Sequence, residues 1–278
     1  SMANGEEQLI SRAEAIGFPV LLRPSYVIGG QGMEIIRSKE SLLNRMANGT
    51  ALVYPVLIDS YIPGKEAEID LIADGNDVYI PIIAEHIEKA GVHSGDSMAL
   101  LPAQSLTDDI KDKMTLYAKK LVSELGYKGL MNIQFVIEGN SVYVLEVNPR
   151  ASRTIPIISK VTDVALVQIA TKILLGKYSL SNAFEKTGLM DEIPYAVVKY
   201  PVFSTFALSG LDSKVGPEMK STGEGIAIGE TVNEALTKVF HAQKANHTTG
   251  VYQSESVQLS EDLSVQIKEA GLTLGNSD

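Results

Sequence analysis

The sequence from residue 132 to 153 decides the fold, and it reads Asn132-Ile-Gln-Phe-Val-Ile-Glu-Gly-Asn-Ser141, then Val142-Tyr-Val-Leu-Glu-Val-Asn148, then Pro149-Arg-Ala-Ser-Arg153. Apolar and β-branched residues fill two runs on either side of a Gly-Asn turn signal, a pattern that predicts a β-hairpin. Side chains alternate between the two faces of a strand. One face of the first arm is therefore entirely apolar, formed by Met131, Ile133, Phe135 and Ile137.

The length of the loop sets which polar side chains of the two arms meet. A three-residue loop, Gly139–Ser141, places Gln134 opposite Glu146 and Asn132 opposite Asn148. A two-residue loop would shift the register by one residue and mix polar with apolar side chains on each face, which a half-buried sheet tolerates poorly. We therefore predict the three-residue loop, with the apolar residues of the second arm on one face: Tyr143, Leu145 and Val147.

Four oxygen-bearing side chains then converge at the end of the hairpin, where the chain turns at Pro149. Magnesium prefers oxygen ligands and commonly takes one or two from the protein, with phosphate oxygens and water completing the shell. An ordinary solvated hairpin face carries the same residue types, so the hairpin alone leaves both interpretations open. Arg150 and Arg153, just beyond it, favour the metal site.

The composition excludes several classes of function. At 278 residues and 45% hydrophobic content the chain can form one large domain or two modest ones, and no run resembles a membrane span. The net charge of −10 argues against nucleic acid or an anionic membrane as the partner. The absence of cysteine excludes disulfides, thiolate nucleophiles and Cys-zinc sites, and four scattered histidines do not suggest a His-based metal site. We expect a soluble, cytoplasmic protein whose chemistry uses carboxylates, amides, Arg, Lys and, as a further candidate, His.

A glycine-rich turn follows an early strand. Pro19–Arg23 reads as a buried strand that delivers Arg23 at its end, and the run 24–32 is Pro-Ser-Tyr-Val-Ile-Gly-Gly-Gln-Gly. A strand follows at 33–36, unlike a Walker loop, which opens a helix and carries Gly-Lys-Ser/Thr. Glycines let backbone N–H groups approach an anion closely, so a phosphate-covering flap is one interpretation and a plain hairpin loop the other.

Two further stretches are candidate functional segments. Acidic and apolar residues alternate from 66 to 72, so Glu66, Glu68 and Asp70 share a face that is either solvated or functional. The loop Ala90-Gly-Val-His-Ser-Gly-Asp-Ser97 is polar and bracketed by glycines, which is typical of ligand loops and of surface turns alike.

The remaining elements alternate without βαβ regularity, which predicts an α+β fold. Beyond about residue 250 the composition turns polar, which predicts a linker and tail. Helices are predicted at 6–16, 39–47, 107–125, 164–175 and 231–241, and strands at 56–62, 66–72, 78–88, 194–202 and 225–229.

As a set, these motifs resemble the large subunit of carbamoyl-phosphate synthetase across roughly residues 6 to 244. The matching runs, in the family's order, are Arg23-Pro-Ser-Tyr-Val-Ile-Gly-Gly, Glu85-His-Ile-Glu with 90–97, Met131-Asn-Ile-Gln-Phe, Glu146-Val-Asn-Pro-Arg-Ala-Ser-Arg and Gly216-Pro-Glu-Met-Lys-Ser-Thr-Gly-Glu224. That subunit has two homologous halves, of which the first phosphorylates bicarbonate and the second carbamate. Residues 33–35 and the run from Gly216 resemble the second half.

The resemblance implies an ATP-grasp fold, in which two α+β subdomains hold the nucleotide between them. It implies a small subdomain with the flap at 6–62, a large subdomain with the metal site at 63–245, and a linker and tail at 246–278 that could open a regulatory domain. It also implies an ATP-dependent ligase of pyrimidine and arginine biosynthesis. ATP and carbamate would be substrates, and the rest of the large subunit and a glutaminase small subunit would be partners.

Residue by residue, the resemblance implies three kinds of role. The magnesium (or manganese) ligands, for two ions bridged by Glu146, are Gln134, Glu146 and Asn148. Arg150 and Arg153 match arginines near the transferred phosphoryl group, and together with Asn148 they form the expected catalytic set. The ATP-binding residues are Arg23, Gly29, Gly30, Ser60, Ile62, Glu66, Gly91, Val92, His93, Ser94, Gln134 and Glu146.

The sequence departs from the family pattern in a few places. Gln31 stands where a basic flap residue is expected, and Lys89 stands where glutamine is expected near a potassium site, which puts a bound potassium in doubt. Ser60 replaces a longer side chain. The family's preceding domain, with a further phosphate-contacting arginine, does not match any part of this chain.

Three functional hypotheses follow. The first is the carbamate-phosphorylating ATP-grasp half. The second is the bicarbonate-phosphorylating half or another ATP-grasp carboxylate ligase. The third is a fragment that binds Mg-ATP without turnover, because the resemblance covers only part of the family's length.

Overall fold

The structure is a computed structural model, and it describes residues 1–25, 30, 32–49, 52–204, 215–245, 250–253, 264–265, 267–268 and 273–276. The chain forms two compact units, each assembled from segments that are distant in sequence. Unit 1 comprises Ser1–Pro63, Ala90–Ser97 and Val202–Gly223, and unit 2 comprises Gly64–Lys89, Met98–Pro201 and Glu224–Asp278. The subdomains expected at 6–62, 63–245 and 246–278 remain a prediction, because compactness alone does not define a functional subdomain.

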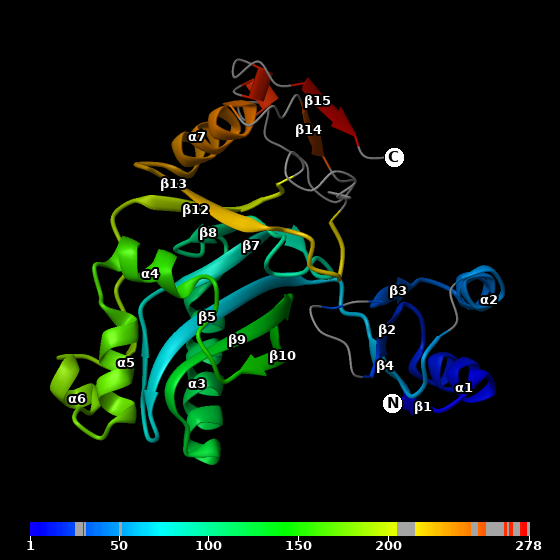
Figure 1. The fold of residues 1–278 in the computed structure, drawn as a ribbon, viewed down its shortest axis with the longest axis horizontal. Helices are drawn as coiled ribbons and strands as arrows, with labels where there is room; N and C mark the ends of the chain where they lie inside the picture. Colours follow the sequence, from blue (N-terminus) through cyan, green and yellow to red (C-terminus); the bar gives the residue numbers. More distant parts are fainter. Residues whose placement is uncertain are drawn as a thin grey trace. The chain divides into compact units, whose positions relative to one another are not determined.

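Unit 1 is built on an antiparallel sheet of order β1-β4-β2-β3, with two helices packed against it (blue in Figure 1). Its core joins Leu9 and Ala13 of the first helix to Leu42 of the second and to the buried side chains of the two central strands. Both predicted helices and the strand pair around the glycine-rich turn are confirmed. The elements are β1 (Met2–Ala3), α1 (Glu6–Ile16), β2 (Val20–Pro24), β3 (Glu34–Ile36), α2 (Lys39–Asn48) and β4 (Val56–Ser60).

Unit 2 contains a nine-stranded sheet whose main path is β10-β9-β5-β7-β8-β12-β13, with β6 and β11 off this path. Within the described residues its neighbouring strands along that path pair antiparallel wherever a register is recorded, consistent with the predicted α+β class. Its strands are β5 (Lys65–Asp74), β6 (Val78–Ile80), β7 (Ile83–Lys89), β8 (Ala99–Leu101), β9 (Lys128–Glu138), β10 (Ser141–Asn148), β11 (Gly188–Leu189), β12 (Ala196–Val202) and β13 (Gly223–Gly229). Its helices are α3 (Asp108–Leu125), α4 (Ile155–Thr162), α5 (Leu166–Leu174), α6 (Leu180–Ala183) and α7 (Val232–Ala245).

The two faces of this sheet are covered differently. On one face, side chains of β5 and β9 such as Ile69 and Phe135 pack against the buried side of α3. On the other face, Ile72 belongs to a second core with α4 and α5. Because side chains alternate along β5, Glu66, Glu68 and Asp70 share the face of Ile72. That face is therefore apolar at one end of β5 and polar at the other.

The hairpin β9–β10 has the predicted pairing but not the predicted loop. Ser141 pairs with Glu138, so the loop is the two residues Gly139 and Asn140, and the three-residue loop is wrong. A β-bulge at Leu145 inserts one unpaired residue, after which Glu146 lies opposite Gln134. The bulge restores the face alternation that the shorter loop would have disturbed.

The side-chain faces of β10 near the loop follow from this arrangement. Val142 pairs with Ile137 and is buried, whereas Tyr143 and Leu145 are 41% and 45% exposed. The expectation that Tyr143 and Leu145 lie on the buried apolar face is therefore wrong. Val147, beyond the bulge, does pack against the core.

Three other expectations need correction. The predicted strand 78–88 is interrupted around Pro81, since proline has no N–H to donate to a sheet, and forms β6 and β7. Helix α4, which directly follows the arginines, was not predicted. In the predicted tail, β14 (Gly250–Gln253) and β15 (Thr273–Asn276) pair in parallel. No helix in the described part of the chain combines the length and apolar content needed to cross a membrane.

Candidate functional site

Two rows of polar side chains cross three adjacent strands of unit 2. The registers place Glu68 of β5 opposite Gln134 of β9, which in turn lies opposite Glu146 of β10. The next row is Asp70, Asn132 and Asn148. The sequence predicted the β9–β10 pairs, and they are confirmed. It marked the acidic face of β5 as a candidate but could not join it to the hairpin, because strand order is not readable from alternation.

The three expected metal ligands lie on this polar face. Gln134 and Asn148 are half-buried and Glu146 is exposed. Asn148 Nδ2 donates to Glu146 Oε1 at 2.8 Å, so its amide oxygen is free to face another group. The set supplies one carboxylate and two amide oxygens from adjacent strands, which are the hard donors that magnesium prefers, and it leaves coordination positions for phosphate and water. These residues therefore fit a magnesium ion whose shell is completed by a ligand.

The described residues contain no group of three or more His, Cys, Asp or Glu side chains arranged to hold a metal by themselves. A metal cage made only of protein carboxylates is not what the geometry offers in this part of the chain.

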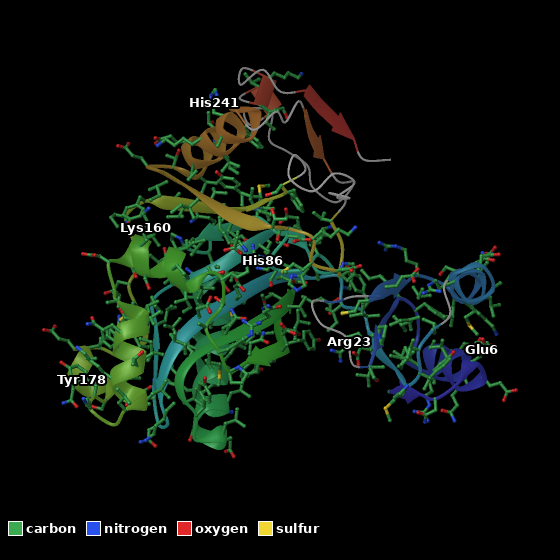
Figure 2. The ribbon with its side chains drawn as sticks, in the orientation of Figure 1. Glu6, Arg23, His86, Lys160, Tyr178 and His241 are labelled. Atoms are coloured by element: carbon green, nitrogen blue, oxygen red, sulfur yellow. The ribbon has the colours of Figure 1, made fainter. Side chains whose placement is uncertain are left out.

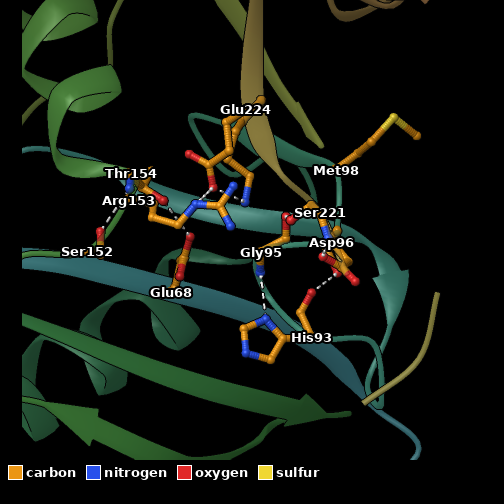
Figure 3. A network of polar contacts seen from close by, with 12 residues as sticks. Glu68, His93, Gly95, Asp96, Met98, Ser152, Arg153, Thr154, Ser221 and Glu224 are labelled. Carbon is orange, nitrogen blue, oxygen red and sulfur yellow. Dashed lines mark hydrogen bonds and ion pairs between the residues drawn. The ribbon is translucent and has the colours of Figure 1, made fainter. Parts of the chain in front are cut away.

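The two arginines lie on the turn that connects β10 to α4. The Arg150 N–H donates to the Asn148 carbonyl at 2.8 Å, and the Thr154 N–H donates to Ser152 Oγ at 3.0 Å. Arg153 Nε lies 3.3 Å from Glu224 Oε1 of β13, as Figure 3 shows. Arg150 Nη1 donates to the Ala151 carbonyl at 3.1 Å, and the contact of either arginine with a phosphoryl group remains a prediction.

A network of buried charges lies behind this face. Glu66, Glu68 and His86 are 7%, 3% and 2% exposed, and Lys199 is 1% exposed. His86 Nδ1 lies 3.4 Å from Glu66 Oε2, and His86 Nε2 lies 3.9 Å from Glu68 Oε1. Figure 2 labels His86 among the strands of this sheet. The solvated interpretation of the acidic face of β5 is therefore wrong.

Glu68 joins three elements of this network. It accepts hydrogen bonds from Asn132 Nδ2 of β9 at 3.3 Å and from Thr154 Oγ1 at 3.2 Å, in addition to its contact with His86 (Figure 3 shows the Thr154 bond). Thr154 follows Arg153 directly, so the buried carboxylate fixes the end of the arginine turn relative to the sheet. Sequence reasoning missed Lys199, which meets Glu224 at 3.9 Å, and gave His86 no role.

In this network, interactions between oppositely charged groups outweigh the cost of burying the charges. Burial opposes ionisation of Glu68, but interactions with His86, Lys199 and Asn132 outweigh it and lower its pKa to about 2. Burial likewise opposes protonation of His86, but Glu66 and Glu68 raise its pKa to about 9. At neutral pH His86 is therefore an imidazolium that lies between the carboxylates of Glu66 and Glu68.

Asp70 behaves differently from its neighbours. It is 1% exposed, and neither carboxylate oxygen accepts a hydrogen bond of normal geometry from the described residues. Burial and the charge of Glu68 raise its pKa to about 8, although Ser152 and Asn132 lie near enough to oppose the shift. Asp70 is therefore mostly a neutral acid at pH 7.

The expected nucleotide residues of unit 1 lie at the ends of its strands. Arg23, labelled in Figure 2, is near the end of β2, and its Nε lies 2.7 Å from Asp59 Oδ2 of β4. Ser60 is the last residue of β4 and is exposed, and Ile62 follows it half-buried. Gly30 adopts φ +74°, a left-handed conformation suited to glycine. Gly29 and Gln31 lie outside the described residues.

The loop 90–97 is part of unit 1. Gly91 adopts φ +106°, a backbone conformation that strains residues other than glycine, and a Cβ there would lie 2.6 Å from Ile35 Cδ1. His93 Nδ1 accepts the Gly95 N–H at 3.1 Å, and the Asp96 N–H donates to the His93 carbonyl at 2.8 Å. Val92, His93 and Ser94 are each half-buried. The loop is an ordered, glycine-dependent turn; the ATP contacts expected of it remain a prediction.

Comparison with known families agrees with these observations. The family model of the carbamoyl-phosphate synthase L chain, ATP binding domain, matches residues 1–182. The arginine-specific carbamoyl phosphate synthase large chain of Geobacillus stearothermophilus is 56% identical over 253 residues, which are 90% of this chain and 24% of that protein. The corresponding chain of Bacillus subtilis (strain 168) is 48% identical over 239 residues, 86% of this chain and 23% of that protein.

Solved structures of low sequence identity share the fold. An N5-carboxyaminoimidazole ribonucleotide synthetase in complex with ADP superposes with a TM-score of 0.67 at 16% identity, covering 89% of this chain and 66% of that chain. The biotin carboxylase domain of the Hydrogenobacter thermophilus 2-oxoglutarate carboxylase, solved with MgADP and bicarbonate, superposes with a TM-score of 0.63 at 18% identity. The match covers 95% of this chain and 63% of that chain.

This chain spans about a quarter of the length of the curated relatives that it matches. The family model nevertheless covers well over half of the chain, and the polar hairpin and the arginine turn lie within the matched residues. The chain belongs to the family of the carbamoyl-phosphate synthase L chain ATP-binding domain, and its fold is the ATP-grasp fold.

Proposed function

We propose that this chain is the part of a carbamoyl-phosphate synthase large chain that phosphorylates carbamate with ATP. The observation that carries the proposal is the row Gln134–Glu146, with Asn148 beside it and two arginines on the following turn. The runs at 33–35 and 216–219 resemble the carbamate half of the family and favour it over the bicarbonate half.

The reaction needs no nucleophile from the protein. An oxygen of the carbamate anion attacks the γ-phosphorus of ATP, the bond from that phosphorus to the β–γ bridging oxygen breaks, and its electron pair leaves with ADP. The charge balances without a proton, since carbamate and ATP give carbamoyl phosphate and ADP. Catalysis then consists mainly of positioning and charge neutralisation. A chain without cysteine is suited to this chemistry.

The metal-ligand candidates and the two arginines would have different roles in this reaction. Gln134, Glu146 and Asn148 would hold magnesium, or manganese, with Glu146 bridging two ions. Bound metal would neutralise the phosphate charge and align the γ-phosphoryl group. Arg150 and Arg153 would contact the transferred group and the acyl phosphate, for which a planar guanidinium that stays charged is well suited.

Further residues would bind the nucleotide. Arg23 and the glycines 29–30 would contact the phosphates, Ser60 and Ile62 the adenine through backbone groups, and Glu66 the ribose hydroxyls. Residues 91–94 would flank the nucleotide. The family pattern also has a potassium site near this loop. The exposed Lys89 stands where that pattern has glutamine, which argues against bound potassium in this chain.

In the intact protein we expect the remaining large-chain domains and a glutaminase small subunit as partners, in the cytoplasm. Arginine and pyrimidine biosynthesis both consume carbamoyl phosphate. The two relatives above are named arginine-specific, which favours the arginine route for this chain as well.

Calorimetric titration with Mg-ATP, on wild type and Glu146→Ala, tests the metal and nucleotide assignment. We expect binding by wild type and a loss of at least about tenfold in the variant, because removing one carboxylate from a divalent site costs more than ~1.4 kcal/mol. Glu138→Ala, exposed at the far end of the same hairpin, is the matched control. Equal binding by Glu146→Ala and wild type would refute the metal site.

Synthesis of ATP from MgADP and carbamoyl phosphate tests the reaction itself. ATP formation favours the carbamate half. Bicarbonate-dependent ATP hydrolysis in the full-length protein, abolished by Glu146→Ala, would favour the bicarbonate half. Nucleotide binding by the isolated chain without either reaction would favour a binding module that needs its neighbouring domains for turnover.

A further inference from the structure

Asp96 is a buried carboxylate to which neither the fold nor the phosphoryl-transfer chemistry described above gives a role. It is 1% exposed and belongs to the loop 90–97 of unit 1. Its Oδ2 accepts the backbone N–H of Lys220 at 2.8 Å, and its Oδ1 accepts the N–H of Ser221 at 2.8 Å. Both oxygens are thus used to hold a segment 124 and 125 residues further along the chain.

Two further hydrogen bonds join the same pair of segments. Ser221 Oγ donates to the Gly95 carbonyl at 2.9 Å, and the His93 N–H donates to the Gly216 carbonyl at 2.7 Å. Figure 3 shows Asp96 and Ser221 directed toward each other, with His93 and Gly95 beside them. The segment 216–221 is therefore fastened at both ends to the loop that carries the expected nucleotide-flanking residues.

The same segment touches the glycine-rich turn. A Cβ at Gly30 would lie 2.1 Å from the carbonyl oxygen of Pro217 and 3.4 Å from the Cα of Glu218. The backbone of Gly30 therefore packs directly on the backbone of Pro217, and no side chain fits between them. Gly30, Pro217 and Asp96 all belong to unit 1, so this stack of three loops lies within one compact unit.

We propose that Asp96 is a positioning residue of the nucleotide site: through segment 216–221 it fixes the backbone of Gly30 relative to loop 90–97. The chain of contacts runs from the Asp96 carboxylate to the amides of Lys220 and Ser221, along the segment to Pro217, and from Pro217 to Gly30. This inference rests on the proposed nucleotide-binding function. It adds that a segment distant in sequence supports Gly30, and that one buried carboxylate holds the segment in place.

Asp96→Asn is the sharpest variant, because it keeps the shape of the side chain. The amide offers one acceptor oxygen and turns an NH₂ group toward the other backbone N–H, so one hydrogen bond is replaced by two opposed donors. We expect the Kd for MgADP, measured by calorimetry on this chain, to rise about tenfold or more, in line with the loss of charge-assisted hydrogen bonds. Hydrogen exchange should also accelerate at Met33, whose N–H donates to the Gly30 carbonyl at 2.9 Å.

Asp74→Asn is the matched control. Asp74 also accepts backbone N–H groups, those of Asn76 and Asp77 through Oδ1 and that of Leu180 through Oδ2, but it lies in unit 2 at the end of β5. We expect this variant to lower stability without changing the Kd for MgADP or exchange at Met33. An effect of Asp96→Asn that matched the control would show a structural role only and overturn the proposal.

A pair of glycines tests the contact with Pro217 separately. Gly30 and Gly32 have similar left-handed φ values, +74° and +69°, so alanine strains the backbone equally at both. Among the described residues, a Cβ at Gly32 meets only Pro24 Cγ at 3.4 Å, an ordinary contact. Gly30→Ala should therefore weaken MgADP binding several-fold more than Gly32→Ala. Equal effects would remove Pro217 from the argument and overturn the proposed relay.

The outcomes separate this proposal from the proposed function. If wild type does not bind MgADP, the proposed function fails. If wild type binds and Asp96→Asn binds equally well, the function stands and the positioning role of Asp96 is refuted. Weaker binding with faster exchange at Met33 supports both.

Discussion

At the scale of single residues, the polar face of unit 2 combines charges of opposite sign with one neutral acid. Glu68, with a pKa of about 2 against an ordinary 4.5, contributes stability above about pH 4.5 that is lost as the pH falls toward 2. His86, with a pKa of about 9 against 6.5, contributes stability below about pH 6.5 that is lost as the pH rises through 9. The folded state should therefore be most stable between about pH 4.5 and 6.5 with respect to these two groups.

Asp70 gives a prediction of its own. Its pKa of about 8 lies above the ordinary 3.8, so the folded state binds the proton more tightly than the unfolded state. Its contribution to the free energy of unfolding is complete below about pH 3.8 and falls as the pH rises through 8. Asp70→Asn removes this dependence, and its free energy of unfolding should decline less between pH 6 and 8.5, by up to about 1.4 kcal/mol per pH unit.

Urea unfolding at several pH values measures this slope for wild type and Asp70→Asn. The exposed Asp112→Asn on α3 is the control, which should follow the wild-type curve at every pH. Parallel curves for wild type and Asp70→Asn would contradict a protonated Asp70. Any remaining decline in the variant belongs to His86 and other groups.

At the scale of elements, the hairpin β9–β10 depends on its bulge. The two-residue loop sets one register near the turn, and the extra residue Leu145 corrects it before Glu146. The sequence predicted the functional pairing from face alternation, which is a strong constraint wherever one face is buried. From the sequence, the extra residue is expected in the loop. The alternation of faces fixes how many residues lie between Gln134 and Glu146, but it does not show which of them is unpaired.

Deletion of Leu145 tests this description of the hairpin. The bulged residue is unpaired and 45% exposed, so its removal leaves Glu146 opposite Gln134. We expect the Kd for MgADP to stay within about threefold of wild type, which is a change in binding free energy of less than ~0.7 kcal/mol. Deletion of both Val144 and Leu145 would place Glu146 opposite Phe135, on the apolar face, and binding should be lost. Loss of binding on the single deletion would contradict the assignment of the bulge.

At the scale of the whole molecule, the expected ligand contacts are divided between the two compact units. Arg23 and residues 91–94 belong to unit 1, and Gln134, Glu146 and the arginines belong to unit 2. A ligand that binds only the folded chain stabilises it by mass action, by ~2.7 kcal/mol at about 100 times its Kd.

Thermal unfolding with nucleotide tests this division. MgADP should raise the unfolding midpoint of the wild type, and removal of magnesium with EDTA should abolish most of the shift, because the proposed metal ion would join the phosphates to Gln134 and Glu146. In Glu146→Ala, MgADP should raise the unfolding midpoint little more than ADP with EDTA does. A full shift in the presence of EDTA would show that the hairpin is not the metal site.

The sequence by itself determined the hairpin, its polar face and the identity of the facing pairs, because alternation and turn chemistry are local. It also predicted the helices of unit 1 and the family, since the motif order is a property of the chain. Only the tertiary structure decided that Glu68 and Asp70 continue those pairs across a third strand, and that His86 and Lys199 compensate the buried acids. The same holds for the hydrogen bonds of Asp96 to residues 220 and 221. The physical reason is that strand order, burial and long-range hydrogen bonds depend on contacts between segments far apart in sequence, and no local pattern encodes them.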